Sequence, residues 1–316
     1  QLKDRKIISP EPYRVNQYFN QKCNLIQAFD IEINELDDVR DTGKLNLDLS
    51  KEEQITGYNI VDEVRQTLQK DKIVVLQPFG QSSKKEGRFI YDSTGRSFEI
   101  TNIQQIIEAL RDEYGVILMS EIEIPGWESQ GIAHPKGLDL NKWIGVINAA
   151  DYFLGCDSVG QHMANAVGKP ATVVIGSTFP ENISYPDNKN FTIIDNGKER
   201  RRYTPIRLTQ DIYTDRNNED LMVLDSSTVK KIVKSIKDKI GVSKKVEPST
   251  NITPKKLSPS NSSSVCNDVK GGSYPKKILP TSKSTVKYNG FQKPKVDTTS
   301  KKKPIDKLLD IEAKKV

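Results

Sequence analysis

The chain has 316 residues, and its charge is divided unevenly along the sequence. Of its 48 Lys/Arg and 42 Asp/Glu residues, 17 and 6 lie in residues 243–316, a net charge of +11, which leaves −5 for residues 1–242. The basic character therefore belongs to the tail and argues against a basic nucleic-acid-binding domain upstream of it. Three cysteines without regular spacing argue against a disulfide scaffold or a zinc site.

The sequence contains neither a membrane-spanning pattern nor a secretory signal. No apolar run approaches the ~20 residues needed to cross a bilayer, and no signal-peptide pattern follows Gln1. We therefore expect a cytoplasmic protein, with peripheral attachment to a membrane as a further possibility. Because the first residue is Gln1 and not Met, we also expect that the chain is a fragment or a processed product.

Residues 1–45 carry only weak hydrophobic patterns, and they predict the flank or remnant of a missing amino-terminal domain without a core of its own. Residues 46–242 are different. Ser50 and Glu53 have the spacing of a capping box, and a helical period of apolar residues follows to Gln69. Thr101 and Gln104 have the same spacing before a second helix, and Ser226 or Ser227 is expected to cap the last one.

Five apolar runs alternate with helical patterns between residues 72 and 240. The expected strands are 72–80, 116–119, 152–154, 171–175 and 191–194; the expected helices are 51–69, 101–110, 140–149, 159–167 and 229–240. A polar loop is expected over 81–97. Alternation of this kind is typical of an α/β fold, a Rossmann-like parallel sheet with helices on both faces.

Residues 243–316 are rich in Lys, Ser, Thr and Pro and contain few apolar residues. Such a segment buries too little surface to offset its ordering entropy, so the sequence predicts a disordered basic tail. Its last part, residues 304–315, has the pattern of a transient amphipathic helix.

The stretch from 152 to 180 holds the candidate functional site. A buried strand leads directly to Asp157, Ser158 and Gly160, which open a helix, and a second strand ends at Ser177 and Thr178. In parallel sheets, ligands bind beyond the carboxyl ends of the strands. A helix that starts there offers unpaired N–H groups and the positive end of its dipole, which suit a phosphate. The plainer interpretation is that Asp157 and Ser158 only cap the helix.

The order of these residues resembles a known family. A strand followed by Asp157-Ser158-Val159-Gly160-Gln161-His162, a helix, Gly168-Lys169-Pro170, a strand and Gly176-Ser177-Thr178-x-Pro180 is similar to the carboxyl-terminal half of the ADP-heptose:lipopolysaccharide heptosyltransferases. The resemblance covers roughly residues 46–240 and is strongest over 138–182. It implies a two-Rossmann GT-B fold, of which this chain holds the donor-binding half, and a role in lipopolysaccharide biosynthesis.

The resemblance also implies roles for individual residues. The donor diphosphate would lie on the start of the helix, next to Ser158, where Gly160 would let the backbone approach closely and His162 would donate a hydrogen bond. Asp157 would cap amides or bind a hydroxyl. Val159 stands where the family has Gly, so the turn is expected to differ there.

Further candidates come from other strand ends. Arg96, in Arg96-Ser97-Phe98, resembles the lysine of a Lys-x-Trp motif that places a cation on the donor phosphates. Glu121 is a candidate for the donor ribose or base, and Gly80 for the lining of the cleft. Ser177 and Thr178 would complete the donor site.

These observations predict a glycosyltransferase that binds a nucleotide-diphosphate sugar and transfers the sugar to a glycan or lipid-linked acceptor. No metal or other cofactor is expected, because helix amides, Arg96 and His162 would carry the charge of the leaving diphosphate. The catalytic base is expected in the missing amino-terminal domain. Two alternatives stay open: a GT-B sugar-nucleotide epimerase and a non-catalytic sugar-nucleotide-binding module. The tail is expected to contact anionic surfaces, without specific recognition of nucleic acid.

Overall fold

The computed structural model describes residues 7–87, 89–92, 94–124, 126–201 and 219–244. Its strands are β1 (Ile73–Gln77), β2 (Ser83–Glu86), β3 (Phe89–Asp92), β4 (Gly115–Leu118), β5 (Tyr152–Cys156), β6 (Ala171–Ile175) and β7 (Phe191–Asp195). Its α-helices are α1 (Asn16–Phe19), α2 (Leu25–Ile33), α3 (Lys51–Leu68), α4 (Ile100–Leu110), α5 (Leu140–Ala149), α6 (Val159–Ala166), α7 (Pro180–Ile183) and α8 (Ser226–Ile240). Short 3₁₀ turns, η1 (Pro12–Arg14), η2 (Trp127–Gln130) and η3 (Glu219–Met222), complete the described elements.

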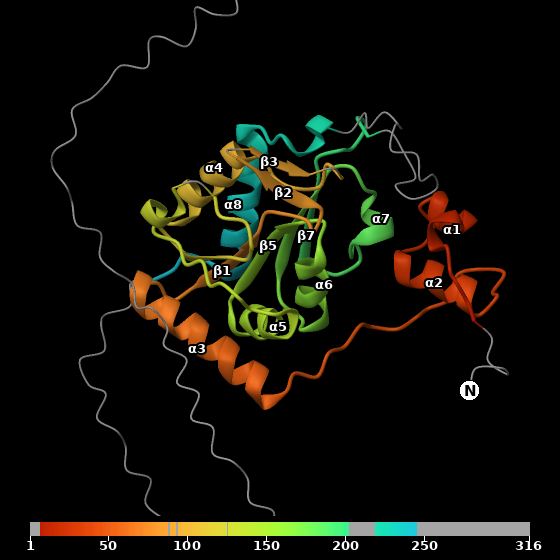
Figure 1. Ribbon diagram of the computed structural model, residues 1–316, viewed down its shortest axis with the longest axis horizontal. Coiled ribbons are helices and arrows are strands. Elements are labelled where there is room, and N and C mark those ends of the chain that lie inside the picture. Colours follow the sequence, from red (N-terminus) through yellow and green to blue (C-terminus); the bar gives the residue numbers. More distant parts are fainter. Residues whose placement is uncertain (1–6, 88, 93, 125, 202–218, 245–316) are drawn as a thin grey trace, which may run out of the picture. The chain divides into compact units, whose positions relative to one another are not determined.

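The centre of the fold is a five-stranded sheet in the order β4-β1-β5-β6-β7, in which every neighbouring pair is parallel (Figure 1). The predicted Rossmann-like α/β fold is therefore confirmed. β6 and α5 begin and end at the predicted residues, because each is a continuous apolar pattern with clear signals at both ends. The capping box of α3 is present as well, with Ser50 and Glu53 bonded reciprocally.

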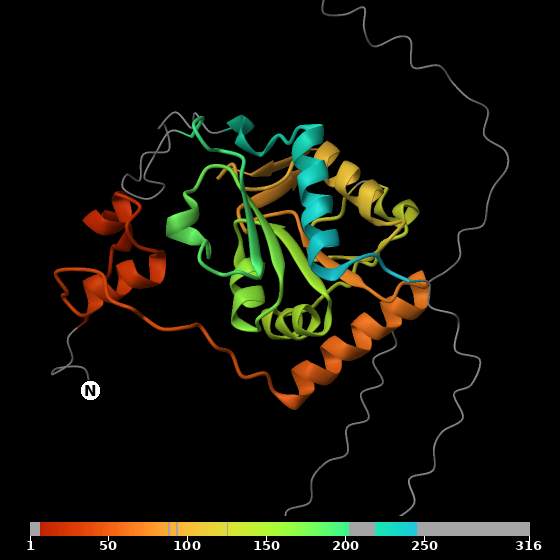
Figure 2. The same cartoon turned by 180° about the vertical axis from the view of Figure 1, so that it is seen from behind.

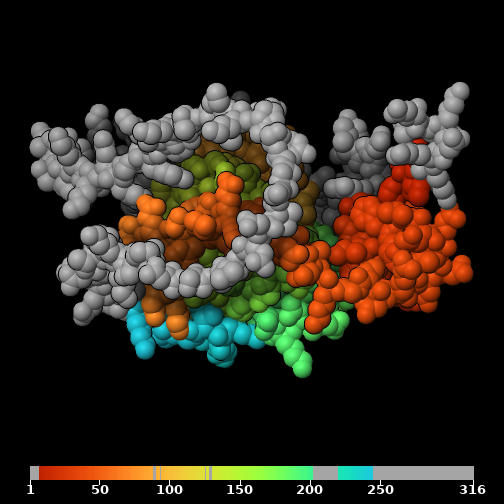
Figure 3. Space-filling model, turned by 90° about the horizontal axis from the view of Figure 1, so that it is seen from below, coloured from red at the N-terminus to blue at the C-terminus, as the bar shows by residue number. Residues whose placement is uncertain are grey.

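Helices cover both faces of this sheet. Alternate residues of the strands, such as Val74 and Leu76, face α4 and α8, whereas Ile73 and Val75 face α3, α5 and α6. Strands that are buried on both faces read as continuous apolar runs, which is why the sequence marks them so clearly. Figure 2 shows α8 in front of the strands on one face. Figure 3 views the molecule from the side of α3, whose side chains form part of the surface there.

α3 packs closely against α5 through two glycines. A Cβ atom on Gly57 would overlap with the backbone of Gly145, and a Cβ atom on Gly145 would overlap with the carbonyl group of Glu53. The backbones of the two helices are therefore in contact, which only glycine permits at these positions.

The strand order reverses direction between β1 and β5. After β1 the chain passes through α4 to β4 at one edge, and α5 then returns it to β5 on the other side of β1. The helices that follow these two central strands, α4 and α6, lie on opposite faces of the sheet. In open α/β sheets, the region beyond the carboxyl ends of two such strands is the usual ligand position, and it is called the crevice below.

Three local predictions were wrong. The segment expected as a polar loop contains an antiparallel hairpin, in which β2 pairs with β3 from Ser83↔Asp92 to Glu86↔Phe89. Its first strand reads SKKE and is largely exposed, so no apolar alternation signals it. α4 begins after Glu99 without a side-chain cap, and α8 is capped by Asp225, whose carboxylate accepts a hydrogen bond from the N–H of Thr228 (2.7 Å).

The amino-terminal segment has a small hydrophobic cluster of its own, contrary to the expectation. Its buried members are Val15, Tyr18, Cys23, Ala28 and Ile31. The segment also contacts the sheet domain, because the buried side chain of Asn182 in α7 donates to the carbonyl oxygens of Tyr18 (2.9 Å) and Cys23 (2.8 Å).

Ser243 and Lys244 are the last described residues, and both are bonded to the start of β1. The Ser243 hydroxyl and the Lys244 N–H donate to Asp71 Oδ1 at 2.6 and 2.7 Å. The predicted disordered tail therefore begins no earlier than residue 245, and the rest of it lies outside the described residues. Across the described ranges, no helix combines the length and the apolar character that a membrane span requires.

Candidate functional site

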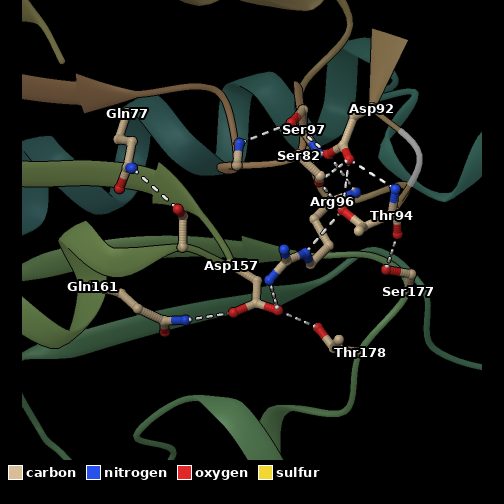
Figure 4. A network of polar contacts seen from close by, with 12 residues as sticks. Gln77, Ser82, Asp92, Thr94, Arg96, Ser97, Asp157, Gln161, Ser177 and Thr178 are labelled. Carbon is tan, nitrogen blue, oxygen red and sulfur yellow. Dashed lines mark hydrogen bonds and ion pairs between the residues drawn. The ribbon is translucent and has the colours of Figure 1, made fainter. Parts of the chain in front are cut away.

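The polar residues of the crevice come from the ends of three neighbouring strands and from the hairpin. Gln77 ends β1, Asp157 follows β5, and Ser177 and Thr178 follow β6. The base of the β2–β3 hairpin contributes Arg96, which reaches toward Asp157 (Figure 4). The structure thus brings together side chains that lie up to about a hundred positions apart in the sequence.

The start of α6 is held by Gln77. The Gln77 amide accepts a hydrogen bond from the N–H of Gly160 (2.8 Å) and donates one to the hydroxyl of Ser158 (3.1 Å). A Cβ atom at Gly160 would overlap with the Gln77 amide and with the ring of Phe153. Gly160 is therefore required by the close packing of α6 on β1 and β5. We had expected it for the approach of a phosphate, but its N–H is already bonded.

Ser158 is the residue that precedes α6, and its side chain makes no capping bond to the helix. The capping role expected for Asp157 is absent too. The Asp157 carboxylate accepts hydrogen bonds from the side chains of Gln161 and Thr178, each at 2.9 Å. The N–H of Gly160 is bonded to Gln77, and that of Gln161 donates to the carbonyl oxygen of Ser158 (3.3 Å), so the positive end of the α6 dipole is what this helix start offers to an anion.

Asp157 is almost completely buried, with 4% of its surface exposed. Burial raises the pKa of its carboxyl group, and the Arg96 guanidinium opposes part of this rise. Arg96 Nη1 lies 3.7 Å from Asp157 Oδ2, with the Arg96 side chain still partly exposed. The cation that the sequence predicted is therefore in the crevice, and it faces a carboxylate there.

Asp92, at the end of β3, is a part of the site that the sequence analysis missed. Its Oδ1 accepts hydrogen bonds from the hydroxyls of Ser82 and Thr94, both at 2.6 Å. Its Oδ2 accepts from the hydroxyl of Ser97 at 2.6 Å and from the N–H of Arg96 at 3.2 Å. Burial alone would raise the pKa of Asp92, but the hydrogen bonds from Ser82, Ser97 and Thr94 hold it far below its usual range.

His162 lies in α6 with its ring partly buried. Its Nδ1 shares a 2.8 Å hydrogen bond with the hydroxyl of Tyr185, and the two rings meet edge to face. Burial lowers the pKa of His162, and nearby Asp157 opposes that shift. Burial thus favours the neutral ring, and when Tyr185 donates to Nδ1 the other ring nitrogen carries the proton and is a hydrogen-bond donor.

Ser177 and Thr178 connect the end of β6 to the rest of the site. The Ser177 hydroxyl donates to the carbonyl oxygen of Thr94 (3.0 Å), and the Thr178 hydroxyl donates to Asp157 (2.9 Å). Both residues are thus part of one network with the hairpin and α6, which an ordinary strand-end turn would not require.

The remaining candidates have different places. Gly80 is buried below the hairpin, and its N–H donates to the Ser97 hydroxyl (2.9 Å). Val159 is the first residue of α6 and has a negative φ, so a β-branched side chain fits without strain. Glu121 is exposed, and among the described contacts only its backbone carbonyl is bonded, to Lys136 Nζ (3.4 Å). The described hydrogen bonds do not connect Glu121 to the network.

Within the part of the chain that the structure describes, no three His, Cys, Asp or Glu residues are grouped so as to hold a metal ion. Cys156 ends β5 beside the site and is fully buried. Burial raises the pKa of its thiol, so Cys156 is not an activated nucleophile.

No protein-family model matches the sequence, and no curated protein matches it. The solved structures that are similar include ADP-heptose lipopolysaccharide heptosyltransferase II of E. coli, which is 14% identical with a TM-score of 0.42, over 61% of this chain and 52% of that one. A glycosyl transferase family 9 protein from Veillonella parvula is 13% identical with a TM-score of 0.47, over 68% and 60% of the two chains. TibC, an iron-containing dodecameric glycosyltransferase of enterotoxigenic E. coli, is 13% identical with a TM-score of 0.44, over 69% and 54%.

The chain thus spans between 52% and 60% of the length of these three structures. At these identities and TM-scores the likeness bears neither on the site residues nor on a substrate.

Proposed function

We propose that this chain is the donor-binding part of a glycosyltransferase and that it binds a nucleotide-diphosphate sugar in the crevice between β1 and β5. The observation that carries this proposal is the position of Arg96 and Ser158 beside Asp157 at the one reversal of strand order in the sheet, with His162 in the first turn of the helix that starts there. A cation, a hydroxyl and an imidazole are thus available near the positive end of α6. This combination suits a diphosphate.

In this proposal each group has a defined task. Arg96 supplies a fork of charged donors to the diphosphate, and the α6 dipole adds a fixed positive potential. Since Gly160 N–H is bonded to Gln77, the contacts to phosphate oxygens are assigned to Arg96, to the Ser158 hydroxyl and to His162. Asp157 would repel a phosphate, so we assign it to a sugar or ribose hydroxyl.

The same groups would assist transfer of the sugar to a glycan or lipid-linked acceptor. The diphosphate gains negative charge as the glycosidic bond breaks, and donors fixed in advance stabilise that charge without further reorganisation. We assign no catalytic base to this chain.

The test is calorimetric titration of the full chain with the ADP-, GDP-, UDP- and CMP-linked sugars, after a thermal-shift screen of the same panel. Arg96→Ala and His162→Ala should each weaken binding of the preferred donor by ~1–3 kcal/mol, the scale of a lost hydrogen bond to a charged group. Arg65→Ala is the matched control, because Arg65 also pairs with an aspartate, Asp151, at the opposite edge of the sheet. Equal affinity of both crevice variants and the native chain would exclude this site.

A further inference from the structure

The base of the β2–β3 hairpin is organised around one carboxylate. Both oxygens of Asp92 are occupied by donors from the residues beside it in the hairpin: the hydroxyls of Ser82, Thr94 and Ser97 and the N–H groups of Thr94, Arg96 and Ser97. A turn of this length needs no buried charge to form. The six hydrogen-bond donors on the Asp92 carboxylate are therefore more than the turn itself requires.

Arg96 is held by this carboxylate in two ways. Its N–H donates directly to Asp92 (3.2 Å). Its Nε donates to the hydroxyl of Thr94 (3.0 Å), which in turn donates to Asp92 (2.6 Å). The first bond fixes the backbone from which the side chain leaves, and the second fixes the plane of the guanidinium group. Both ends of a long, rotamer-rich side chain are thereby restrained.

Asp92 does not neutralise the cation that it holds. In the described ion pairs the Arg96 guanidinium meets Asp157, at 3.7 Å, and not Asp92. Figure 4 shows the side chain extending from the Asp92 cluster toward Asp157. The carbonyl oxygen of Thr94 also accepts a hydrogen bond from Ser177 (3.0 Å), which ties the same loop to the end of β6.

We propose that Asp92 is a positioning residue: through Thr94 and the backbone it holds the Arg96 guanidinium in the crevice, ready for an anionic group of the ligand. An arginine side chain loses about 2 kcal/mol of rotamer entropy when it is fixed. Because folding already restrains the Arg96 side chain, ligand binding does not lose this rotamer entropy, and the affinity is higher. The inference rests on the proposed function for the identity of the ligand, a diphosphate.

The binding test is a double-mutant cycle on the full chain. Asp92→Asn keeps the size of the side chain but replaces one acceptor oxygen by a donor, and it should weaken binding of the preferred nucleotide sugar about tenfold, as one lost charge-assisted hydrogen bond would. If Asp92 acts through Arg96, the double variant with Arg96→Ala binds no more weakly than Arg96→Ala alone. If the fold-loss of affinity in the double variant equals the product of the two single fold-losses, the inference is overturned. Asp139→Asn, which alters a carboxylate that caps α5, is the control and should bind normally.

A second readout needs no ligand, so it separates this inference from the proposed function. The ¹H–¹⁵N signal of Arg96 Nε is assigned by its loss in Arg96→Ala. It should be shifted and protected from exchange in the native chain, and it should move to the position of a solvated arginine in Asp92→Asn. An unchanged signal overturns the inference even if nucleotide sugars bind. Absence of nucleotide binding by the native chain would overturn the proposed function alone. If Asp92→Asn does not fold, Thr94→Val removes the hydroxyl that connects Nε to Asp92 and must give the same change.

Discussion

The parallel strands of the central sheet all begin on one side, called the amino-terminal edge, and all end on the other, the carboxyl-terminal edge. The two edges carry similar polar side chains, but these side chains make different contacts. At the amino-terminal edge, Asp151 accepts hydrogen bonds from the N–H of Ile73 (2.8 Å) and from Arg65 (2.9 Å). Asp71 likewise accepts from the N–H of Lys244 (2.7 Å). The carboxylates at this edge fix the backbone at the point where strands begin.

At the carboxyl-terminal edge, the described contacts of the Asp157 carboxylate are all to side chains, those of Gln161, Thr178 and Arg96. The Oε1 atom of Gln161 is buried there without a partner. Side-chain partners can reorient when a ligand enters, whereas the N–H of a strand can leave its partner only if the sheet opens. The amino-terminal edge therefore serves stability, whereas the side-chain contacts at the carboxyl-terminal edge can be exchanged without opening the sheet.

The largest effect is expected from a change in the packing that supports the carboxyl-terminal edge. Gly160→Ala should destabilise the protein by ~2–3 kcal/mol, because the added methyl group overlaps with the Gln77 amide and the Phe153 ring. Gly80→Ala is the matched control at the same edge. The nearest atom to its Cβ would be Asp92 Oδ2 at 3.7 Å, so its stability should change by less than ~1 kcal/mol. Equal chemical-denaturation midpoints for the two variants would contradict the packing described for α6.

A smaller effect is expected to distinguish Asp151, which is half-buried, from Asp157, which is buried. Asp151→Asn should cost ~1–2 kcal/mol at neutral pH, because it weakens the bond to the strand N–H and the ion pair with Arg65. Asp157→Asn should cost nothing measurable, because it removes a buried charge and Gln161 has an oxygen available for the new amide.

The pH dependence of these effects has a definite sign. The pKa of Asp157 is raised by burial, so the stability it contributes is present below the ordinary aspartate value of about 3.9 and is lost as pH rises through the raised value. Asp157→Asn should therefore gain stability relative to the native chain between pH 4 and pH 7. The pKa of Asp92 is lowered, so Asp92→Asn should behave in the opposite way, with a deficit at pH 7 that shrinks below about pH 4. If the stability of both variants relative to the native chain changed in the same direction with pH, the pKa directions given for Asp157 and Asp92 would be wrong.

The parts of the fold that could be predicted from sequence are those in which burial alone fixes the pattern. The strand 171–175 and the helix 140–149 were found because their apolar residues are continuous or follow a helical period. The hairpin was missed because Ser83–Glu86 is largely exposed and its sequence resembles a loop. Asn24 and Gln27 form a capping box on α2 that a search for this spacing would have found.

The candidate site could be located from sequence but its contacts could not. Strand ends followed by Asp157, Ser158 and Thr178 predict a site at the carboxyl-terminal edge of the sheet, where the structure places these residues. Asp92 gave no signal, because its role depends on hydroxyls brought together by the hairpin and on an arginine that meets Asp157 only in the folded state. The packing role of Gly160 also gave no signal in the sequence, since only the structure places Gln77 against it.

The smallest expected effect is that of the basic tail on binding of the nucleotide sugar. Residues 245–316 carry 16 Lys/Arg and 6 Asp/Glu, a net charge of +10, and they follow Lys244, which is bonded at the amino-terminal edge. The groups proposed to hold the nucleotide sugar lie between Arg96 and His162 in the sequence, and none of them belongs to residues 245–316. A truncated chain, 1–244, keeps the contacts of Ser243 and Lys244 with Asp71 and should bind the nucleotide sugar within about twofold of the full chain.

On vesicles that contain acidic lipids the two chains should differ. Basic residues close to an anionic surface each contribute about 1 kcal/mol, and this attraction declines with salt. We therefore expect the full chain, but not residues 1–244, to sediment with such vesicles at low salt, and DNA in place of vesicles measures how much of this is general attraction to anions. Equal sedimentation of both chains, or sedimentation that salt does not reduce, would mean that the tail is not an electrostatic tether. A large loss of nucleotide affinity on truncation would instead mean that the tail takes part in the site, and that the division of tasks between the two edges is wrong.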